Sequence, residues 1–227
     1  MDVKEVLPIH IVAISGSLRT GGNTDQAVEY AAAVAVNHGA AFTPIRLADY
    51  NIHPCGTCGD CNSKKTPCEL QDDMPRIIDV MLSADGLIYA APVYGFGLAH
   101  LMQIFIERSG VCYLKFKRPL ANKVGGVIVT GRRYNHGQVY SQIIQNLLLN
   151  RMILVGSGFP AIVHAGKLDE AKQDMEGMAS IRQMVTRMID MISLIKHQQQ
   201  SSDSPLLQCL DDNEQSRYSV LEMTTSN

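Results

Sequence analysis

Short apolar runs and longer mixed segments alternate along the chain. Residues 9–15 form a short, mainly apolar run that stops at a glycine, which predicts a buried strand. Residues 23–37 are rich in Ala and Val and end near Gly39, which predicts a helix with a glycine stop. The same patterns predict further strands over residues 41–47, 86–91, 124–130 and 152–155, and further helices over residues 72–82, 98–108, 138–149 and 168–196. Five successive β-α units predict an α/β fold with a mainly parallel sheet and helices on both faces.

The composition is typical of a globular protein with one domain plus appendages. The chain has 227 residues, of which 46% are hydrophobic and 19% charged. No apolar stretch reaches the roughly 18 residues of a membrane span. The net charge is −2 without a Lys/Arg block, which argues against binding to nucleic acid or to an anionic membrane. Residues 1–8 are charged and do not resemble a signal peptide, so we expect a cytoplasmic protein.

The composition changes after Lys196. Residues 197–205 are typical of a polar linker, and residues 197–227 contain five acidic residues and one basic residue. The net charge of this last segment is therefore −4, which leaves +2 for the rest of the chain. We expect residues 1–196 to form the domain. Residues 197–227 would form either a disordered tail or an arm that docks on a neighbouring subunit.

Four cysteines lie close together, at Cys55, Cys58, Cys61 and Cys68. The first three have the spacing C-x2-C-x2-C, so one tight loop can aim three thiolates at one point. Four thiolates, three of them from a compact run, are typical ligands of a [4Fe–4S] cluster, so residues 51–72, the cysteine segment, are expected to bind metal. Structural zinc is an alternative, although it usually draws on two separated C-x2-C pairs. Redox-active or metal-free thiols are another, whereas disulfides would need an oxidising compartment.

Ligands of a doubly wound sheet bind beyond the carboxyl ends of its strands, and three loops there carry suitable residues. The first loop, residues 15–24, combines glycines, hydroxyls and a helix start, which is typical of an anion site. It lacks the lysine of a nucleoside-triphosphate loop and the glycine spacing of a dinucleotide fingerprint. The loop therefore predicts a site for one terminal phosphate, held by backbone N–H groups, Ser17, Thr24 and Arg19.

The second loop, residues 92–98, follows the third predicted strand. Pro92, Gly95 and Gly97 give it a rigid shape that allows close backbone approach. Tyr94 or Phe96 supplies an aromatic wall, as a flat cofactor requires, although aromatic residues near strand ends are more often part of the core.

The third loop, residues 130–138, follows the fourth predicted strand. Arg132 and Arg133 can balance negative charge on a cofactor, and Gly131 and Gly137 allow close contact. His136 stands alone among polar residues of the loop and is not assigned a catalytic role.

The order G-S-x-R…N-T, P-V-Y-G and T-G-R-R…H-G-Q resembles the flavodoxin-like NAD(P)H-dependent FMN reductases over residues 9–166. With the cysteines and the D-D-M after them, the chain most resembles the iron–sulfur flavoprotein branch. The resemblance implies a five-stranded parallel sheet of order 2-1-3-4-5, bound FMN, and homodimers or homotetramers with flavins near subunit interfaces. It implies FMN contacts from Ser15, Ser17, Arg19, Asn23, Thr24, Pro92, Val93, Tyr94, Gly95, Phe96, Thr130, Gly131, Arg132 and Gly137.

The resemblance also implies an activity. An FMN-dependent oxidoreductase would pass electrons from NAD(P)H or a reduced carrier, through FMN and a [4Fe–4S] cluster, to a small acceptor. Alternatives are a non-catalytic electron carrier and a biosynthetic FMN-dependent dehydrogenase acting on a small organic substrate. Carriers usually have a strongly acidic docking face, so the charge of +2 outside the tail favours the enzyme. No acid/base pair or nucleophile stands out, and the redox chemistry requires none.

Overall fold

The computed structural model describes residues 8–56, 58, 61, 67–114, 118–201 and 207, without the side chains of residues 111 and 112. Within these residues the strands are β1 (His10–Ser15), β2 (Ala41–Arg46), β3 (Gly86–Tyr94), β4 (Gly97–Leu98), β5 (Val124–Gly131), β6 (Ile153–Leu154) and β7 (Ile162–His164). The α-helices are α1 (Asn23–Asn37), α2 (Met74–Ser83), α3 (His100–Arg108), α4 (His136–Leu149) and α5 (Met175–Ser201). A π-helical turn, Ser109–Tyr113, continues α3, and 3-10 turns lie at Leu47–Asp49 and Ala171–Gln173.

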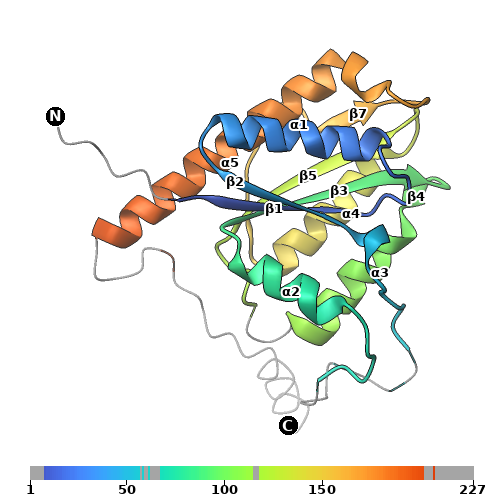
Figure 1. Cartoon of the computed structure of the whole chain (residues 1–227). Coiled ribbons are helices and arrows are strands. Elements are labelled where there is room, and N and C mark those ends of the chain that lie inside the picture. Colours follow the sequence, from blue (N-terminus) through green and yellow to red (C-terminus); the bar gives the residue numbers. More distant parts are fainter. Residues whose placement is uncertain are drawn as a thin grey trace, which may run out of the picture.

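Helices cover both faces of the sheet, as the alternating pattern predicts (Figure 1). Helices α1 and α5 pack on one face against a core that includes Ile11, Ile88 and Ile128. Helices α2, α3 and α4 pack on the other face, where Val12, Leu87 and their strand neighbours form a second core. Strands buried on both faces read as nearly continuous apolar runs, which is why the strands could be predicted from such runs. Among the described helices, none combines the length and the apolar character of a membrane span.

The five predicted strands lie in the predicted order. Strands β2, β1, β3, β5 and β6 follow one another across the sheet, and all of these neighbours pair in parallel. Among the described residues the sheet has seven strands rather than five, because β4 pairs antiparallel with β3 and β7 pairs parallel with β5. Strands β6 and β7 both lie along β5, each for only part of its length. Two- and three-residue strands carry too little pattern to be recognised from sequence.

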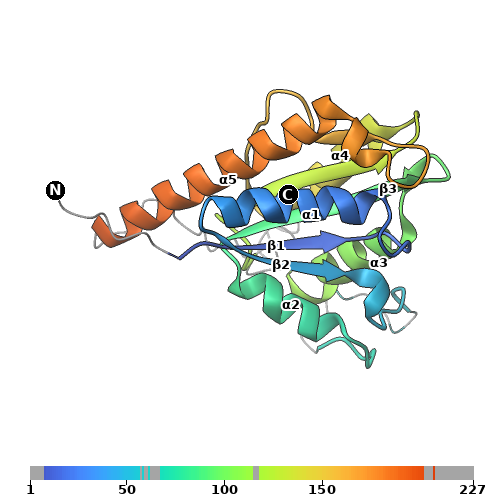
Figure 2. The same cartoon turned by 45° about the horizontal axis from the view of Figure 1, so that its top comes forward.

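Two predicted boundaries need correction. The loop predicted at residues 92–98 is largely β-structure, because β3 continues to Tyr94 and turns through Gly95 and Phe96 into β4. The last helix begins at Met175 rather than at residue 168, and it continues past Lys196 to Ser201. Figure 2 shows α5 running beside α1 and extending well beyond the end of that helix. Most of the predicted tail, Cys209 included, and the side chain of Cys112 lie outside the described residues.

Candidate functional site

The first predicted loop lies between β1 and α1 and buries its hydroxyl groups. The side chains of Ser15, Ser17 and Thr24 are almost fully buried. The Ser15 and Ser17 hydroxyls accept hydrogen bonds from the backbone N–H groups of Ser17 and Arg19, at 3.4 and 3.2 Å. These bonds fold the loop tightly onto itself, so that its polar groups are fixed before any ligand binds.

A partly buried ion pair that was not predicted from the sequence supports this loop. Asp25, in the first turn of α1, accepts a hydrogen bond from the backbone N–H of Gly21 at 2.9 Å. The Asp25 carboxylate lies 3.0 Å from Nε of Arg46, the last residue of β2, and Arg46 also donates to the Thr20 hydroxyl at 3.0 Å. Arg46 thus offsets the negative charge of Asp25, which would otherwise repel an anion bound by the loop.

Strands β3 and β5 supply the residues that face the loop. The hydroxyls of Thr24 and Thr130 are 2.6 Å apart, which joins the start of α1 to the end of β5. The guanidinium of Arg19 lies 5.9 Å from the ring centre of Tyr94, in a cation–π arrangement. Contacts from three segments of the chain therefore meet at the carboxyl end of the sheet.

These segments enclose a cleft of about 240 Å³, which we call the strand-end cleft. Ten of the fourteen residues predicted to bind the cofactor line it, namely Ser17, Arg19, Asn23, Thr24, Pro92, Val93, Tyr94, Thr130, Gly131 and Arg132. Three further lining residues, Gly22, Ala165 and Gly166, were not predicted. The last two follow β7, a strand too short to be recognised in the sequence.

The other four predicted residues lie beside the strand-end cleft. The Ser15 hydroxyl lies 3.4 Å from the Asp25 carboxylate, and Gly137 is in the first turn of α4. Gly95 and Phe96 form the turn between β3 and β4, both with positive φ, and Phe96 is 67% exposed. Positive φ is uncommon for a bulky residue, and here the Asn135 side chain donates to the Phe96 carbonyl at 2.8 Å and holds the turn. Asn23 lines the cleft, but its amide also binds the backbone of Lys167 and Ala171.

Two histidines pack together next to the cleft. His136 is buried, and its ring centre lies 4.6 Å from that of the exposed His164. Burial lowers the pKa of His136, and the charge of His164 lowers it further, although the backbone of Gly131 partly opposes the shift. His136 is therefore neutral at pH 7, and its position is that of a packing residue behind Gly131.

The cysteine segment is closed at its base by a set of contacts that we call the neck. Asn51 and Asp73 are joined by two hydrogen bonds, from Asn51 N–H to the Asp73 carboxylate at 2.7 Å and from Asp73 N–H to the Asn51 carbonyl at 2.9 Å. The Asp72 carboxylate accepts a hydrogen bond from the backbone N–H of His53 at 3.1 Å. Both ends of the segment are thus tied together ahead of α2.

A buried ion pair seals the neck. Arg108, the last residue of α3, lies 2.6 Å from the Asp72 carboxylate, and both side chains are fully buried. Arg108 also donates to the His53 carbonyl at 2.6 Å and to the sulfur of Cys68 at 3.5 Å. Burial alone would lower the pKa of Arg108, but the hydrogen bonds and charge of Asp72, with a smaller contribution from Cys68, raise it above its usual range. Burial alone would raise the pKa of Asp72, but the hydrogen bonds from Arg108 and from the backbone of His53 and Met74, together with the charge of Arg108, lower it below its usual value. Both groups stay charged.

The four predicted cysteines lie between the two ends of the segment that the neck joins. Cys61 is buried, and Cys55, Cys58 and Cys68 are partly exposed. Burial raises the pKa of the Cys55 thiol, and the nearby charges of Glu107, Cys61 and Cys58 raise it further, so Cys55 lies within electrostatic range of Cys58 and of Cys61. Over the part of the chain that the structure describes, no three His, Cys, Asp or Glu side chains are placed to hold a metal ion.

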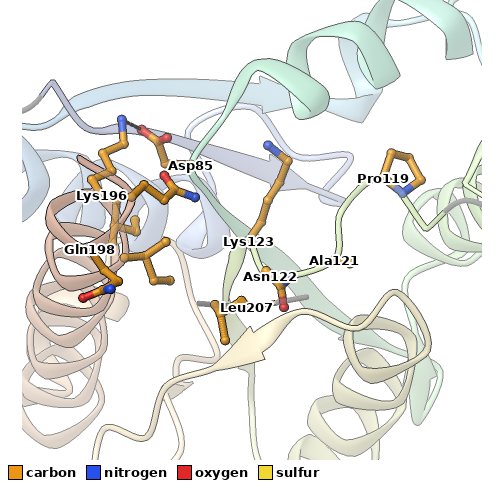
Figure 3. Close-up of a pocket in the computed structure, with 11 residues that line it drawn as sticks. Asp85, Pro119, Ala121, Asn122, Lys123, Lys196, Gln198 and Leu207 are labelled. Carbon is orange, nitrogen blue, oxygen red and sulfur yellow. Dashed lines mark ion pairs between the residues drawn. The ribbon is translucent and has the colours of Figure 1, made fainter. Parts of the chain in front are cut away.

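Another pocket lies at the opposite, amino-terminal end of the strands (Figure 3). Asp85 and Lys123 directly precede β3 and β5 there, and Lys196 of α5 lies 2.7 Å from the Asp85 carboxylate. Leu207 also lines this pocket, so a residue of the predicted tail lies against its own domain. The Asp85–Lys196 ion pair ties α5 to the start of β3. The described residues that line this pocket include no nucleophile and no part of the first loop.

Comparisons with known proteins identify the family and the fold. The family model described as NADPH-dependent FMN reductase matches residues 9–167. An iron-sulfur flavoprotein of Methanocaldococcus jannaschii is 32% identical over 82% of this chain and 98% of its own length. An iron-sulfur flavoprotein of Methanosarcina thermophila is 30% identical over 82% of this chain and 96% of its own. Among solved structures, RosB with a bound riboflavin-phosphate intermediate superposes with a TM-score of 0.72 at 17% identity, over 94% of this chain and 87% of that one, which supports the fold alone.

Proposed function

Since the chain belongs to the family of NADPH-dependent FMN reductases, we propose that this oxidoreductase holds FMN in the strand-end cleft and a [4Fe–4S] cluster on the cysteine segment. It would take electrons from NAD(P)H or a reduced carrier and deliver them to a small acceptor. The observation that carries the proposal is the cleft itself. Ten residues predicted from three separate loops line one cavity at the carboxyl end of a doubly wound sheet.

The residues of the strand-end cleft fit FMN. A terminal phosphate needs several short-range donors and no competing negative charge, and the buried hydroxyls of Ser17 and Thr24 stand beside the start of α1. Asp25, the one acidic group bonded to this loop in the described residues, is paired with Arg46. A cavity of about 240 Å³ can take the phosphate and the chain attached to it, with the flat ring over the exposed rim near Tyr94.

The donor set of the cysteine segment fits an iron–sulfur cluster, because such a cluster takes four sulfur ligands and three of these cysteines have the C-x2-C-x2-C spacing. A [4Fe–4S] cluster would use Cys55, Cys58, Cys61 and Cys68 as its ligands. The printed names of the two archaeal relatives, both iron-sulfur flavoproteins, support this choice over zinc. Coordination requires the thiols to come closer together than in the described residues, where no three ligating side chains are placed to hold a metal ion.

The protein's own residues would bind and orient the FMN and balance its negative charge. When bound, FMN would accept electrons in pairs and the cluster would carry them singly. Arg132, exposed at the rim, would place positive charge beside the flavin, and Arg133 and Lys167 line an adjoining cavity with it. This adjoining cavity is basic enough to receive the phosphates of a nicotinamide dinucleotide. No described side chain in the cleft is needed as a general acid or base.

Anaerobic stopped-flow absorbance tests the proposed reaction. Rapid loss of the flavin absorbance on mixing with NADH or NADPH is expected, and the same mixing with FMN-free protein is the control. Reduction by a reduced ferredoxin but by neither nucleotide would identify the donor as a reduced carrier. If NADH, NADPH and the reduced ferredoxin all leave the flavin oxidised, the proposed reaction is wrong.

The surroundings of the site also suggest assembly. Phe96 and Tyr134 lie in contact at the rim, with ring centres 6.2 Å apart, and both are more than half exposed. A homodimer or homotetramer would cover such a rim and complete the wall around the flavin ring. A cytoplasmic location accords with reduced cysteines.

A further inference from the structure

Arg108 has more contacts than a structural ion pair requires. Its guanidinium donates to Asp72 with both terminal nitrogens, to the His53 carbonyl and to the Cys68 sulfur. These partners come from both ends of the cysteine segment, because His53 precedes Cys55 and Asp72 follows Cys68. A planar guanidinium can hold several acceptors in fixed directions, which an ammonium cannot.

The charge of Arg108 also reaches further into the segment. Nε of Arg108 is buried and has no hydrogen-bond partner among the described residues, so one donor remains for a further acceptor. The positive charge of Arg108 acts on Cys55 as well as on Cys68, and on Tyr113 in the adjoining π-helical turn. Arg108 is therefore a buried cation that contacts Cys68 and lies within electrostatic range of Cys55.

Helix α3 connects this cation to the flavin side of the molecule. The helix begins at His100, just after β4. Met102 in its first turn packs against Gly16 of the first loop (residues 15–24), which we also call the phosphate loop. The helix is nine residues long and ends at Arg108. A rigid element thus links the strand-end cleft to the neck, and the position of Arg108 is fixed by the same helix that supports the first loop.

We propose that Arg108 is the positioning residue of the cysteine centre. It holds the neck closed in the metal-free protein, and its N–H···S hydrogen bond to Cys68 makes the bound centre easier to reduce. Hydrogen bonds to ligand sulfurs and nearby positive charge raise the reduction potential of such clusters. This inference rests on the proposed function, because a potential exists only if the segment holds a redox centre.

The test uses two substitutions at Arg108 and a matched control. Arg108→Lys retains the positive charge but loses the forked geometry. Arg108→Met combined with Asp72→Asn removes both charges, so that neither remains buried alone, and this double variant covers the case in which a single change does not fold. Arg187→Met, at an exposed site on α5, is the control. Equal FMN content in all variants would show that the domain is intact.

Two readouts separate a positioning role from a merely structural one. Hydrogen exchange of the Asn51, His53 and Asp73 amides in metal-free protein should rise by about an order of magnitude in both variants, because the neck has lost its seal. The midpoint potential of the cluster, measured by an anaerobic titration, should become more negative in both. Arg187→Met should change neither.

The outcomes are distinguishable from those of the proposed function. Unchanged potentials in both variants overturn the inference, even if the neck exchanges faster, since Arg108 would then be only structural. Neck exchange equal to that of the unsubstituted protein also overturns it. Absence of iron and sulfide from the unsubstituted protein instead contradicts the proposed cluster, and neck exchange then still decides whether Arg108 closes the segment.

Discussion

The strand-end cleft and the cysteine segment differ in what holds their binding groups in place. In the cleft, the backbone of three parallel strands delivers the residues to one edge, and hydroxyl contacts such as Thr24 to Thr130 lock them together. In the cysteine segment, order comes from its base, where one buried arginine ties the two ends. The cleft is therefore formed by the fold, whereas the segment is a tethered loop that a metal would complete. We therefore expect that a substitution in one region can remove its cofactor while the other region keeps its own.

The largest expected effect is loss of the cluster on substitution of its ligands. Cys55→Ala, Cys58→Ala, Cys61→Ala or Cys68→Ala should each abolish the broad iron–sulfur absorbance, because a cubane needs all four thiolates. FMN content should remain that of the unsubstituted protein, since the strand-end cleft does not depend on the segment. Absorbance spectra of anaerobically purified variants provide the measurement.

Cys112→Ala and Cys209→Ala are the matched controls for this series. Both should retain both cofactors, since neither belongs to the compact run of cysteines. Retention of the iron–sulfur signal in all four ligand variants would instead contradict the assignment.

The reciprocal experiment removes FMN. Ser17→Asp places a carboxylate at a buried position of the phosphate loop, so repulsion of the phosphate should reduce flavin binding by two orders of magnitude or more. The iron–sulfur signal should persist. Fluorimetric flavin content is the measurement, and Ser17→Ala, which adds no charge, should lose much less. A yellow Ser17→Asp protein with full flavin content would show that the phosphate binds elsewhere.

Gly16→Ala examines the contact between the phosphate loop and α3, the helix that ends at Arg108. A Cβ at Gly16 would lie 2.6 Å from Cβ of Met102, so the phosphate loop and α3 must move apart. We expect a loss of stability of about 1–3 kcal/mol and a weaker affinity for FMN, both measured by urea unfolding with and without added flavin. Gly21→Ala makes a control of another kind, because no atom lies near that position and only its positive φ of 65° opposes the change. Equal FMN affinity in Gly16→Ala and the unsubstituted protein would mean that α3 does not support the loop.

Arg132→Ala should have a smaller effect, confined to the cleft. The side chain is exposed, so its interaction with a negative flavin or nicotinamide phosphate is worth less than about 1 kcal/mol. We expect a few-fold slower turnover and a lower flavin potential, with no change at the cysteine segment. Arg133→Ala, which does not line the strand-end cleft, should change the flavin potential less. If both variants have the same kinetics and flavin potential as the unsubstituted protein, both arginines are solvated loop charges.

The smallest effect is a pH dependence of stability from His136. The pKa of His136 is lowered below the usual 6.5 by burial, so the unfolded chain binds the proton first as the pH falls. Stability should therefore be unaffected by this group above pH 6.5 and should decrease progressively below it. His136→Gln should reduce that decrease between pH 7.5 and pH 5.5, measured as the change in Tm of FMN-free protein. An unaltered pH profile would show that His136 titrates normally.

The contrast between the two regions also explains what the sequence could predict. The order of the five main strands and the bounds of α1 follow from apolar runs and a glycine stop, which are local signals. The loops that line the cleft were predictable because parallel strands bring their carboxyl ends together, and individual residues such as Asn23, Val93 and Thr130 came from the resemblance to the FMN reductases. The short strands β4 and β7 were not predicted, and neither were Ala165 and Gly166, the lining residues that follow β7.

The supporting charges could not be predicted because their partners are distant in the chain. Asp25 pairs with Arg46, and Asp72 with Arg108, which lies 36 positions further along. Asp72 could be seen in the sequence as a helix start and Arg108 as a helix end, but neither pattern indicates that they meet in the interior. Only the three-dimensional arrangement shows that the base of the cysteine segment is buried and charged.

Cofactor content of the unsubstituted protein tests the central claim most directly. The account predicts that protein purified without oxygen carries about one FMN, four irons and four sulfides per chain. Flavin extraction, iron analysis and sulfide analysis on the same sample would give the three ratios. FMN accompanied by zinc, or by no metal, would contradict the proposed cysteine centre, and absence of flavin would contradict the assignment of the strand-end cleft.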